Sequence, residues 1–345
     1  MNTMKHKLFV VALLFFCSFA WAEEFPICMY GVNKPEDIPL IKQAGFTCIR
    51  TYSKDSEKLT AIAQTAKDNN IQLVIYSNQA VDTPCQEMAK DWPMLAWYLA
   101  DEPDVHKLSR ERVTEIHKKS KEIFPNHQTA LVIGQGKTVV PYYDLSDILM
   151  VDWYPVPHLP LTSFGDNVRL AKEGQESAGV GNRPLWGVVQ AFDWKEYQQY
   201  RPDNDRIGRF PTEAEIRFMS YDGILNGATG LFYYTFGTKD GTLASAHPDW
   251  WTRVVSVSQE LNKLLPVLEN GKIVENPFTV AGPLTAQTRL YKKYKYIILL
   301  NRSDKPVNVP KTLLKRNYQL LVGSEKFPQM PAYGAWVIKK RNSIF

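Results

Sequence analysis

Apolar and polar positions alternate along the chain in two rhythms. Short apolar runs bounded by turn residues predict strands, whereas apolar residues three and four apart predict helices. The predicted strands are Ile27–Gly31, Thr47–Tyr52, Gln72–Ser77, Leu95–Asp101, Gln128–Ile133, Ile148–Tyr154, Leu185–Ala191 and Gly230–Phe236. The predicted helices are Pro35–Ala44, Ser56–Asn69, Lys107–Phe124, Phe164–Ser177, Thr212–Leu225 and Ser256–Leu268.

Strands that alternate with helices predict an α/β protein built from βαβ units around a parallel sheet. The number of units and the length that they occupy are typical of a (β/α)8 TIM barrel over residues 23–269. A doubly wound open sheet is the alternative. It usually carries a glycine-rich phosphate turn after its first strand, and Gly31-Val32-Asn33-Lys34 is not such a turn.

The pattern changes near Asn270. Residues 270–345 contain short apolar runs and turns, without helical periodicity, and Tyr291–Leu300 is the longest predicted strand. Its lysines Lys292, Lys293 and Lys295 alternate with tyrosines, as expected on the solvent face of a strand. We therefore expect a small antiparallel, β-sandwich-like domain after the barrel.

The N-terminus has the pattern of a signal peptide over residues 1–22. Lys5 and Lys7 precede the apolar run Leu8–Ala20, and Ala20-Trp21-Ala22 supplies a small-residue cleavage site. The run is shorter than the roughly 20 residues of a membrane-spanning helix, so a retained anchor is the less favoured alternative. The sequence predicts an exported protein, periplasmic or secreted, with no membrane span after removal of the signal.

Charge and cysteine content narrow the possibilities further. The 41 lysines and arginines exceed the 36 acidic residues by little and are spread along the chain, which argues against nucleic-acid binding. Outside the signal, Cys28, Cys48 and Cys85 allow one disulfide at most. Cys28 and Cys48 lie on the first two predicted strands and could be neighbours, although buried free thiols are the favoured interpretation.

The strongest chemical signal is the stretch Met94–Asp104. An aromatic-rich apolar run ends abruptly in Asp101, Glu102 and Pro103. Carboxylates at the end of a buried strand are costly unless water, a partner or a ligand contacts them. In a barrel, ligands bind at that end of the strands, so we expect the chemical centre here.

The other strand ends would surround the same mouth. They add one arginine, an amide, two more carboxylates and several aromatic rings, namely Arg50, Tyr52, Tyr76, Asp152, Trp153, Tyr154, Gln190, Asp193, Trp194 and Tyr234. Flat rings stack on the apolar face of a pyranose, and polar groups bind its hydroxyls. Cleavage of a glycosidic bond requires one protonated and one ionised carboxyl, so the mixture indicates a carbohydrate substrate.

The chain resembles the (β/α)8 glycoside hydrolases of the clan that includes β-galactosidases and cellulases, and in particular bacterial glycosidase-like barrels with a β-sandwich tail. The segments that carry this resemblance are residues 45–52, 97–103, 152–155, 211–217 and 227–234. The resemblance implies that Glu102 is the general acid/base and that Arg50 is an active-site arginine near the nucleophile.

Two positions depart from the pattern of the clan. Asp101 stands where the clan has asparagine, and Gln190 stands where it has the nucleophilic glutamate. Glutamine cannot form a glycosyl-enzyme ester, so we expect Gln190 to bind a substrate hydroxyl. Asp152, Asp101 or Asp193 could supply the second carboxyl group, or Asp101 and Asp152 could be turn residues.

Asp152 is the favoured partner of Glu102. A separation of about 6.5–9.5 Å between the two carboxyl groups would fit an inverting mechanism, and one of about 5–5.5 Å a retaining mechanism. Asp101 could instead raise the pKa of Glu102 by repulsion, and Asp193 could turn into the mouth.

Metal and serine chemistry find no support in the sequence. The mature chain has no HxH, HExxH, CxxC or GxSxG pattern, and no cofactor is implied. The first hypothesis is an exported glycoside hydrolase that cleaves O-glycosidic bonds in a poly- or oligosaccharide. The alternatives are a barrel that binds glycan without hydrolysing it and an envelope scaffold protein. The sequence does not give the oligomeric state.

Overall fold

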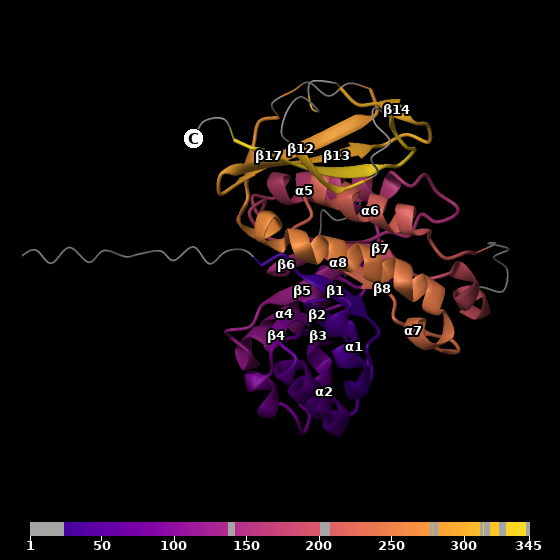
Figure 1. The fold of residues 1–345 in the computed structure, drawn as a ribbon. Helices are drawn as coiled ribbons and strands as arrows, with labels where there is room; N and C mark the ends of the chain where they lie inside the picture. Colours follow the sequence, from indigo (N-terminus) through magenta and orange to yellow (C-terminus); the bar gives the residue numbers. More distant parts are fainter. Residues whose placement is uncertain are drawn as a thin grey trace, which may run out of the picture.

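The computed structural model describes residues 24–136, 142–200, 208–276, 278, 282–310, 313, 318–323 and 329–342. The predicted signal peptide lies outside these residues. Eight parallel strands close into a barrel, which confirms the predicted fold (Figure 1). They are β1 (Ile27–Tyr30), β2 (Cys48–Arg50), β3 (Gln72–Tyr76), β4 (Met94–Tyr98), β5 (Thr129–Ile133), β6 (Ile148–Asp152), β7 (Leu185–Gln190) and β8 (Gly230–Tyr234).

Helices surround the barrel. They are α1 (Ile38–Gln43), α2 (Ser56–Asp68), α3 (Pro103–His106), α4 (Arg110–Ile123), α5 (Ser163–Ser177), α6 (Glu213–Leu225), α7 (Leu243–Ala246) and α8 (Pro248–Asn270). Short 3-10 turns are η1 (Pro35–Asp37), η2 (Ser77–Gln79), η3 (Met88–Asp91) and η5 (Trp194–Tyr200), and β9 (Gly237–Thr238) pairs with β10 (Gly241–Thr242). None of the helices described is long and apolar enough to cross a membrane.

Local sequence signals set several helix boundaries. The side chains of Asp55 and Ser109 accept hydrogen bonds from backbone N–H groups in the first turns of α2 and α4. Thr212 and Glu215 form a reciprocal capping box at the start of α6. The last helix of the barrel starts at Pro248 rather than at the predicted Ser256, because a proline is well suited to the first turn.

Alternation along each strand determines which side chains reach the mouth. Cys28, Val74, Met150, Val188 and other small and apolar side chains fill the interior of the barrel. Residues two positions further along the same strands point the same way. Tyr30, Tyr76, Asp152 and Gln190 occupy such positions, so they project inward at the carboxyl ends of the strands.

The C-terminal region forms a five-stranded antiparallel sheet in the order β11-β12-β13-β17-β15, beside a small two-stranded sheet. The strands are β11 (Lys272–Val274), β12 (Leu284–Tyr291), β13 (Tyr294–Asn301), β14 (Val307–Asn308), β15 (Tyr318–Val322), β16 (Gln329–Met330) and β17 (Ala335–Arg341). The predicted strand Tyr291–Leu300 begins three residues too early: β13 starts at Tyr294, because a hairpin turn at Lys292, whose φ is 53°, separates it from β12. Lys292 and Lys293 lie in this turn and only Lys295 lies in a strand.

The sheet packs on helices α5, α6 and α8 of the barrel (Figure 1). One of its faces, including Ile298 and Val337, joins the main core, while Ile297 and Trp336 cover a separate small core. Arg302 ties the two parts together with Nε 2.9 Å from the fully buried Asp222 carboxylate. Its Nη2 donates to Asp166 Oδ1 over 2.9 Å. Removal of one partner of such a buried pair would leave an uncompensated charge.

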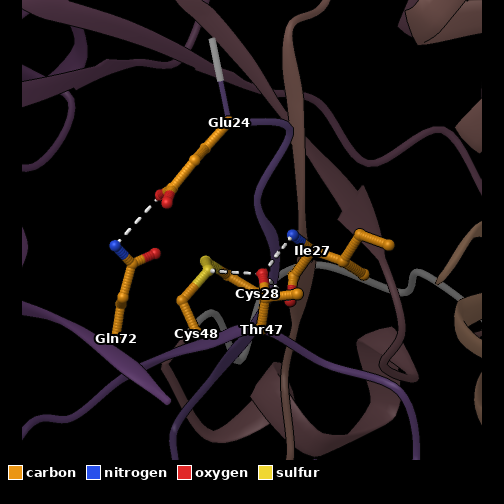
Figure 2. The surroundings of a disulfide bond; sticks show 6 residues. All are labelled: Glu24, Ile27, Cys28, Thr47, Cys48 and Gln72. Carbon is orange, nitrogen blue, oxygen red and sulfur yellow. Dashed lines mark hydrogen bonds between the residues drawn. A yellow bond between two sulfur atoms is a disulfide. The ribbon is translucent and has the colours of Figure 1, made fainter. Parts of the chain in front are cut away.

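A disulfide joins the first two strands of the barrel. Cys28 and Cys48 are directly paired in the register of β1 and β2, with their Cα atoms 4.5 Å apart. Figure 2 shows the bond beside Thr47, whose hydroxyl accepts a hydrogen bond from Ile27 N over 3.0 Å. The favoured interpretation of free thiols is therefore wrong for this pair, whereas Cys85 is free and buried.

The disulfide predicts a measurable contribution to stability. It closes a loop with a sequence separation of 20 residues, which corresponds to about 3 kcal/mol through restriction of the unfolded chain. We expect the double variant C28A/C48A to lower the free energy of unfolding by about that amount in urea denaturation. Reductant should lower the stability of the wild type and of the control Cys85→Ala, but not that of the double variant. An unchanged wild type in reductant would contradict this.

Candidate active site

A pocket of 420 Å³ lies at the carboxyl ends of the strands, in the mouth of the barrel. Eight of its fifteen lining residues are aromatic and three are acidic. The full lining is Tyr30, Tyr52, Asp101, Glu102, Val105, Gly134, Gln135, Asp152, Trp153, Tyr154, Leu159, Phe192, Trp194, Tyr197 and Tyr234. Neither lysine nor arginine contributes to this wall within the described part of the chain.

Glu102 is held in an unusual backbone conformation. It follows β4 and precedes Pro103, which starts α3, and its φ and ψ of 39° and 58° are left-handed. Such a conformation costs about 1–3 kcal/mol for a residue with a side chain, and it persists where surrounding structure enforces it. A Cβ at Gly134 would lie 2.6 Å from Glu102 Oε1, so the glycine after β5 provides the space for the carboxyl group.

Glu102 and Asp152 form a pair of interacting carboxyl groups. Burial raises the pKa of Asp152 well above its usual range, and the charge of Glu102 and a hydrogen bond with it raise the pKa further. Burial also raises the pKa of Glu102, while the hydrogen bond from Asp152 opposes that shift. Asp152 Oδ1 is buried and has no hydrogen-bond partner among the described residues, which disfavours its ionised form.

The two carboxyl groups are close enough for each to change the pKa of the other. The pair therefore behaves as one unit that retains a proton at higher pH than an isolated carboxyl group. The side chain of Glu102 is 27% exposed, and both members of the pair line the pocket.

Asp101 forms the third acidic part of the wall. Its Oδ1 accepts a hydrogen bond of 2.6 Å from the hydroxyl of the buried Tyr98. Its negative charge also raises the pKa of Glu102, although less than burial does. The expected repulsion between Asp101 and Glu102 is thus present, together with the contact between Glu102 and Asp152.

Arg50 lies behind the pocket rather than in its wall. Its guanidinium carbon is 4.1 Å from the ring centroid of Tyr52, 4.2 Å from that of Tyr98 and 4.9 Å from that of Tyr30. The side chain is fully buried. Because Tyr30 and Tyr52 line the pocket, Arg50 supports the wall through cation–π contacts, each worth about 2 kcal/mol when desolvated.

Gln190 has a structural task. Its side chain is fully buried, its Oε1 accepts a hydrogen bond from Val156 N over 2.8 Å, and its Nε2 donates to Val156 O over 2.8 Å. Nε2 also donates to Phe192 O. The expectation that Gln190 binds a substrate hydroxyl is corrected accordingly, because its donors and its acceptor already hold the loop after β6.

Two other predicted residues lie away from the pocket. Asp193 Oδ1 accepts a hydrogen bond from Lys195 N over 2.8 Å at the start of η5, so it does not turn into the mouth. Tyr76 lines a neighbouring pocket, with its ring 4.7 Å from the Arg50 guanidinium. The other predicted residues, Tyr52, Trp153, Tyr154, Trp194 and Tyr234, line the pocket with the three acids.

The aromatic wall contains residues that the sequence analysis missed. Tyr30 lies edge-on to Tyr234 at 5.5 Å, and the rings of Phe192 and Tyr197 are 5.0 Å apart. Tyr30 ends the first predicted strand, so its position in the alternation could have revealed it. Tyr197 belongs to η5, whose fold over the mouth had no signal in the sequence.

Metal binding gains no support from the geometry. No group of three or more histidine, cysteine or carboxylate side chains in the described chain is arranged to hold a metal ion. Within the described chain, the pocket offers three acidic side chains and aromatic faces.

Comparisons with known proteins agree on the fold. No family model and no curated protein matches the sequence. An alpha-amylase from Geobacillus thermoleovorans, complexed with acarbose, is 12% identical, with a TM-score of 0.54 over 94% of this chain and 99% of that chain. A GH30 endoxylanase from Clostridium papyrosolvens is 11% identical, with a TM-score of 0.58 over 92% and 96%.

An Anoxybacillus alpha-amylase is 10% identical, with a TM-score of 0.57 over 94% of this chain and 99% of that chain. The matches extend across both the barrel and the C-terminal sheet. This chain therefore has the (β/α)8 barrel fold of glycoside hydrolases, followed by a small β-domain.

The hydrogen bonds of the buried Gln190 with Val156 predict the effect of a glutamate at this position. Gln190→Glu would oppose an ionised carboxylate to the carbonyl of Val156, so we expect a loss of about 1–3 kcal/mol in stability and no gain of glycosidase activity. Burial would raise the pKa of the new carboxyl group in the folded state. Its protonated form can donate, so the deficit should shrink as the pH falls from 8 to 5.

Gln190→Met is the matched control because it removes the same hydrogen bonds without adding a titrating group. Its deficit should not depend on pH. Urea denaturation at several pH values measures both variants, and a Gln190→Glu protein as stable as the wild type at pH 8 would contradict the structural role of Gln190.

Proposed function

We propose that the protein is an exported glycoside hydrolase that cleaves O-glycosidic bonds in a poly- or oligosaccharide. The observation that carries the proposal is the pair Glu102–Asp152 in an aromatic-walled pocket at the mouth of a barrel with the fold of glycoside hydrolases. Tyrosine and tryptophan rings suit the apolar faces of a sugar. The size of the pocket, 420 Å³, is within the usual range for small-molecule sites.

Glu102 is the proposed proton donor. Burial and the neighbouring acids keep a proton on the pair at a pH where an isolated carboxyl group would be ionised. Glu102 passes this proton to the oxygen of the leaving group as the bond to the anomeric carbon breaks. After this transfer the pair of Glu102 and Asp152 holds one proton fewer, and the next protonation restores its starting state.

The attacking group in this proposal is water. Gln190 cannot supply a covalent nucleophile and is committed to the backbone of Val156. Asp101, fixed by the hydroxyl of Tyr98, is the carboxylate that accepts a proton from the water as its oxygen bonds to the anomeric carbon. Asp101 then releases its proton to solvent and the pair takes one up, so the reaction consumes one water and needs no cofactor.

A second candidate function is glycan binding without hydrolysis. The buried Gln190 favours it, because a glutamine cannot form a glycosyl-enzyme ester and its side chain is bonded to the backbone of Val156. In that case the same aromatic pocket would bind sugar, and neither the wild type nor a variant of Glu102 would release product. An envelope scaffold protein would instead show no affinity for sugar at this pocket.

Export is part of the proposal. The disulfide Cys28–Cys48 supports it, because such bonds form and persist in oxidising compartments and are rare in the cytosol. The predicted signal peptide over residues 1–22 leads to the same compartment.

Replacement of the proposed donor tests hydrolysis directly. We expect Glu102→Gln to lower kcat on the best glycan of a screening panel by about 10²–10⁴-fold, because a general acid typically contributes that factor. Binding of the same glycan should persist, since the amide has nearly the same shape. Reducing-end release and calorimetry measure the two properties. Undiminished turnover in Glu102→Gln would exclude the proposed mechanism, and sugar binding without turnover in the wild type would favour the second candidate.

The pH profile tests the pair. Asp152→Asn removes the carboxyl group whose pKa burial and the charge of Glu102 raise well above its usual range, so only Glu102 is left to hold the proton. The protonated donor is then lost at lower pH. We expect the alkaline limb of kcat/KM to move down by roughly one pH unit. Asp193→Asn, at the start of η5, is the control and should leave the limb in place. An unmoved limb in Asp152→Asn would show that the pair does not control the proton.

A further inference from the structure

The charge of the chain is divided unevenly between its two parts. Residues 271–345, which include the C-terminal sheets, contain 14 lysines and arginines and three acidic residues. Residues 23–270, which include the barrel, contain 25 and 33. The near balance of the whole chain therefore conceals a basic C-terminal part on an acidic barrel. Such an asymmetry indicates a negatively charged partner for the basic part.

Strand register gathers much of this positive charge at one end of the five-stranded sheet. The hairpin between β12 and β13 turns at Lys292 and Lys293, and the last residues of β17 pair with the first residues of β13. Lys272 begins β11 and pairs with Leu290, close to the same turn. We call this end of the sheet the basic end. Its cations are Lys272, Lys292, Lys293, Lys295, Lys339, Lys340 and Arg341.

The cations of the basic end lack acidic partners. Among the residues that the structure describes, no carboxylate forms an ion pair with any of the seven. Lys340 donates a hydrogen bond to Leu313 O over 2.7 Å, and Lys339 Nζ lies 4.3 Å from the ring centroid of Tyr294. The exposed members are Lys272, Lys292, Lys293 and Arg341. Because like charges repel one another, an approaching anion relieves this repulsion.

Apolar and aromatic side chains lie among these cations. Ile273 on β11 is 56% exposed. Lys292 Nζ is 5.1 Å from the ring centroid of Tyr291, and Lys293 Nζ is 5.8 Å from that of Tyr294. Tyrosine rings favour the headgroup region of a membrane, and apolar side chains beside lysines enter the boundary between headgroups and acyl chains. The combination fits an anionic bilayer better than a dissolved polyanion, which has no apolar layer.

The basic end lies on the opposite side of the molecule from the pocket. Phe25, just before β1, donates a hydrogen bond to Glu269 at the end of α8, and Arg289 on β12 donates to Leu268 O over 2.6 Å. The start of β1, the end of α8 and the basic end therefore lie together at the amino ends of the barrel strands, whereas the pocket lies at their carboxyl ends (Figure 1). The predicted signal peptide would join the chain on this side, since Glu24 precedes β1.

We propose that the basic end is a docking surface for the anionic phospholipid face of a membrane. Its lysines bind phosphate groups, while Ile273 and the two tyrosines beside the turn enter the interfacial layer. The acidic barrel is held away from the surface, and the mouth with its pocket faces solvent. The proposal is independent of hydrolysis, because no residue of the pocket takes part in docking.

Binding to vesicles tests the docking surface. The probes are vesicles of phosphatidylglycerol mixed with phosphatidylcholine and vesicles of phosphatidylcholine alone, and the protein is the chain without its predicted signal peptide. Co-sedimentation gives a partition coefficient for each. We expect partition onto the mixed vesicles to be at least about tenfold stronger at low salt, and the difference to shrink as added salt screens the charges. Equal partition onto both kinds of vesicle would overturn the proposal.

Charge variants locate the surface. K292N/K293Q removes two charges from the turn, and asparagine tolerates the left-handed backbone at position 292. Partition onto mixed vesicles should fall by roughly 30-fold, the factor expected when two cations are lost from an anionic surface. K339Q/R341Q, at the end of β17, makes the same test if the turn variant does not fold.

The matched control removes the same charge from the opposite side of the molecule. K54Q/K58Q replaces two exposed lysines, one after β2 and one in the first turn of α2, and should leave partition unchanged. Vesicle binding that survives both K292N/K293Q and K339Q/R341Q, or that falls equally in the control, would overturn the assignment to the basic end.

Soluble polyanions separate membrane docking from binding of negative charge in general. Alginate, a polymer of carboxylated sugars, and duplex DNA carry charge without an apolar layer. We expect weaker binding to both polymers than to mixed vesicles of equal charge, and a loss of vesicle binding in Ile273→Ser. Binding to either polymer as tight as to the vesicles, with Ile273→Ser unchanged on the vesicles, would overturn membrane docking in favour of a polyanion site.

Discussion

The functional arrangement depends on one repulsive contact that the barrel enforces. Glu102 follows strand β4 and Asp152 ends β6, which are separated by β5, and closure of the sheet brings their carboxyl groups together. Two buried carboxylates in contact cannot both ionise at little cost, so the pair retains a proton. The left-handed backbone of Glu102 and the missing side chain at Gly134 hold this contact in place.

Residues around the pair divide into those that contact a ligand and those that support the wall. Arg50 and Gln190 occupy positions where a resembling glycosidase has site residues, yet both are fully buried here. Arg50 holds tyrosine rings by cation–π contacts, and Gln190 fixes the loop after β6. In the proposal, the three acids that line the pocket therefore have the catalytic roles. The barrel tolerates such changes because its strand ends are separate positions on a rigid frame.

Stabilisation of the scaffold comes from elements far from that chemistry. The disulfide between β1 and β2 restricts the unfolded chain, and Arg302 binds the C-terminal sheet to buried Asp222 on α6. The sheet covers α5, α6 and α8 with the apolar side chains of one face. These links leave the mouth of the barrel free, so the loops that form the pocket can differ without loss of the core.

The sequence by itself determined the order of the eight strands and placed Tyr52, Asp101, Glu102, Asp152 and Tyr234 at or just after strand ends, because apolar runs and turn residues mark where strands stop. It could not show that Gln190 faces a backbone carbonyl, that Asp193 caps a turn, or that a hairpin divides Tyr291–Leu300. Those features depend on loop paths and on partners distant in the chain. Only the tertiary structure decided the contact between Glu102 and Asp152, since closure of the barrel sets the distance between strands that are not neighbours.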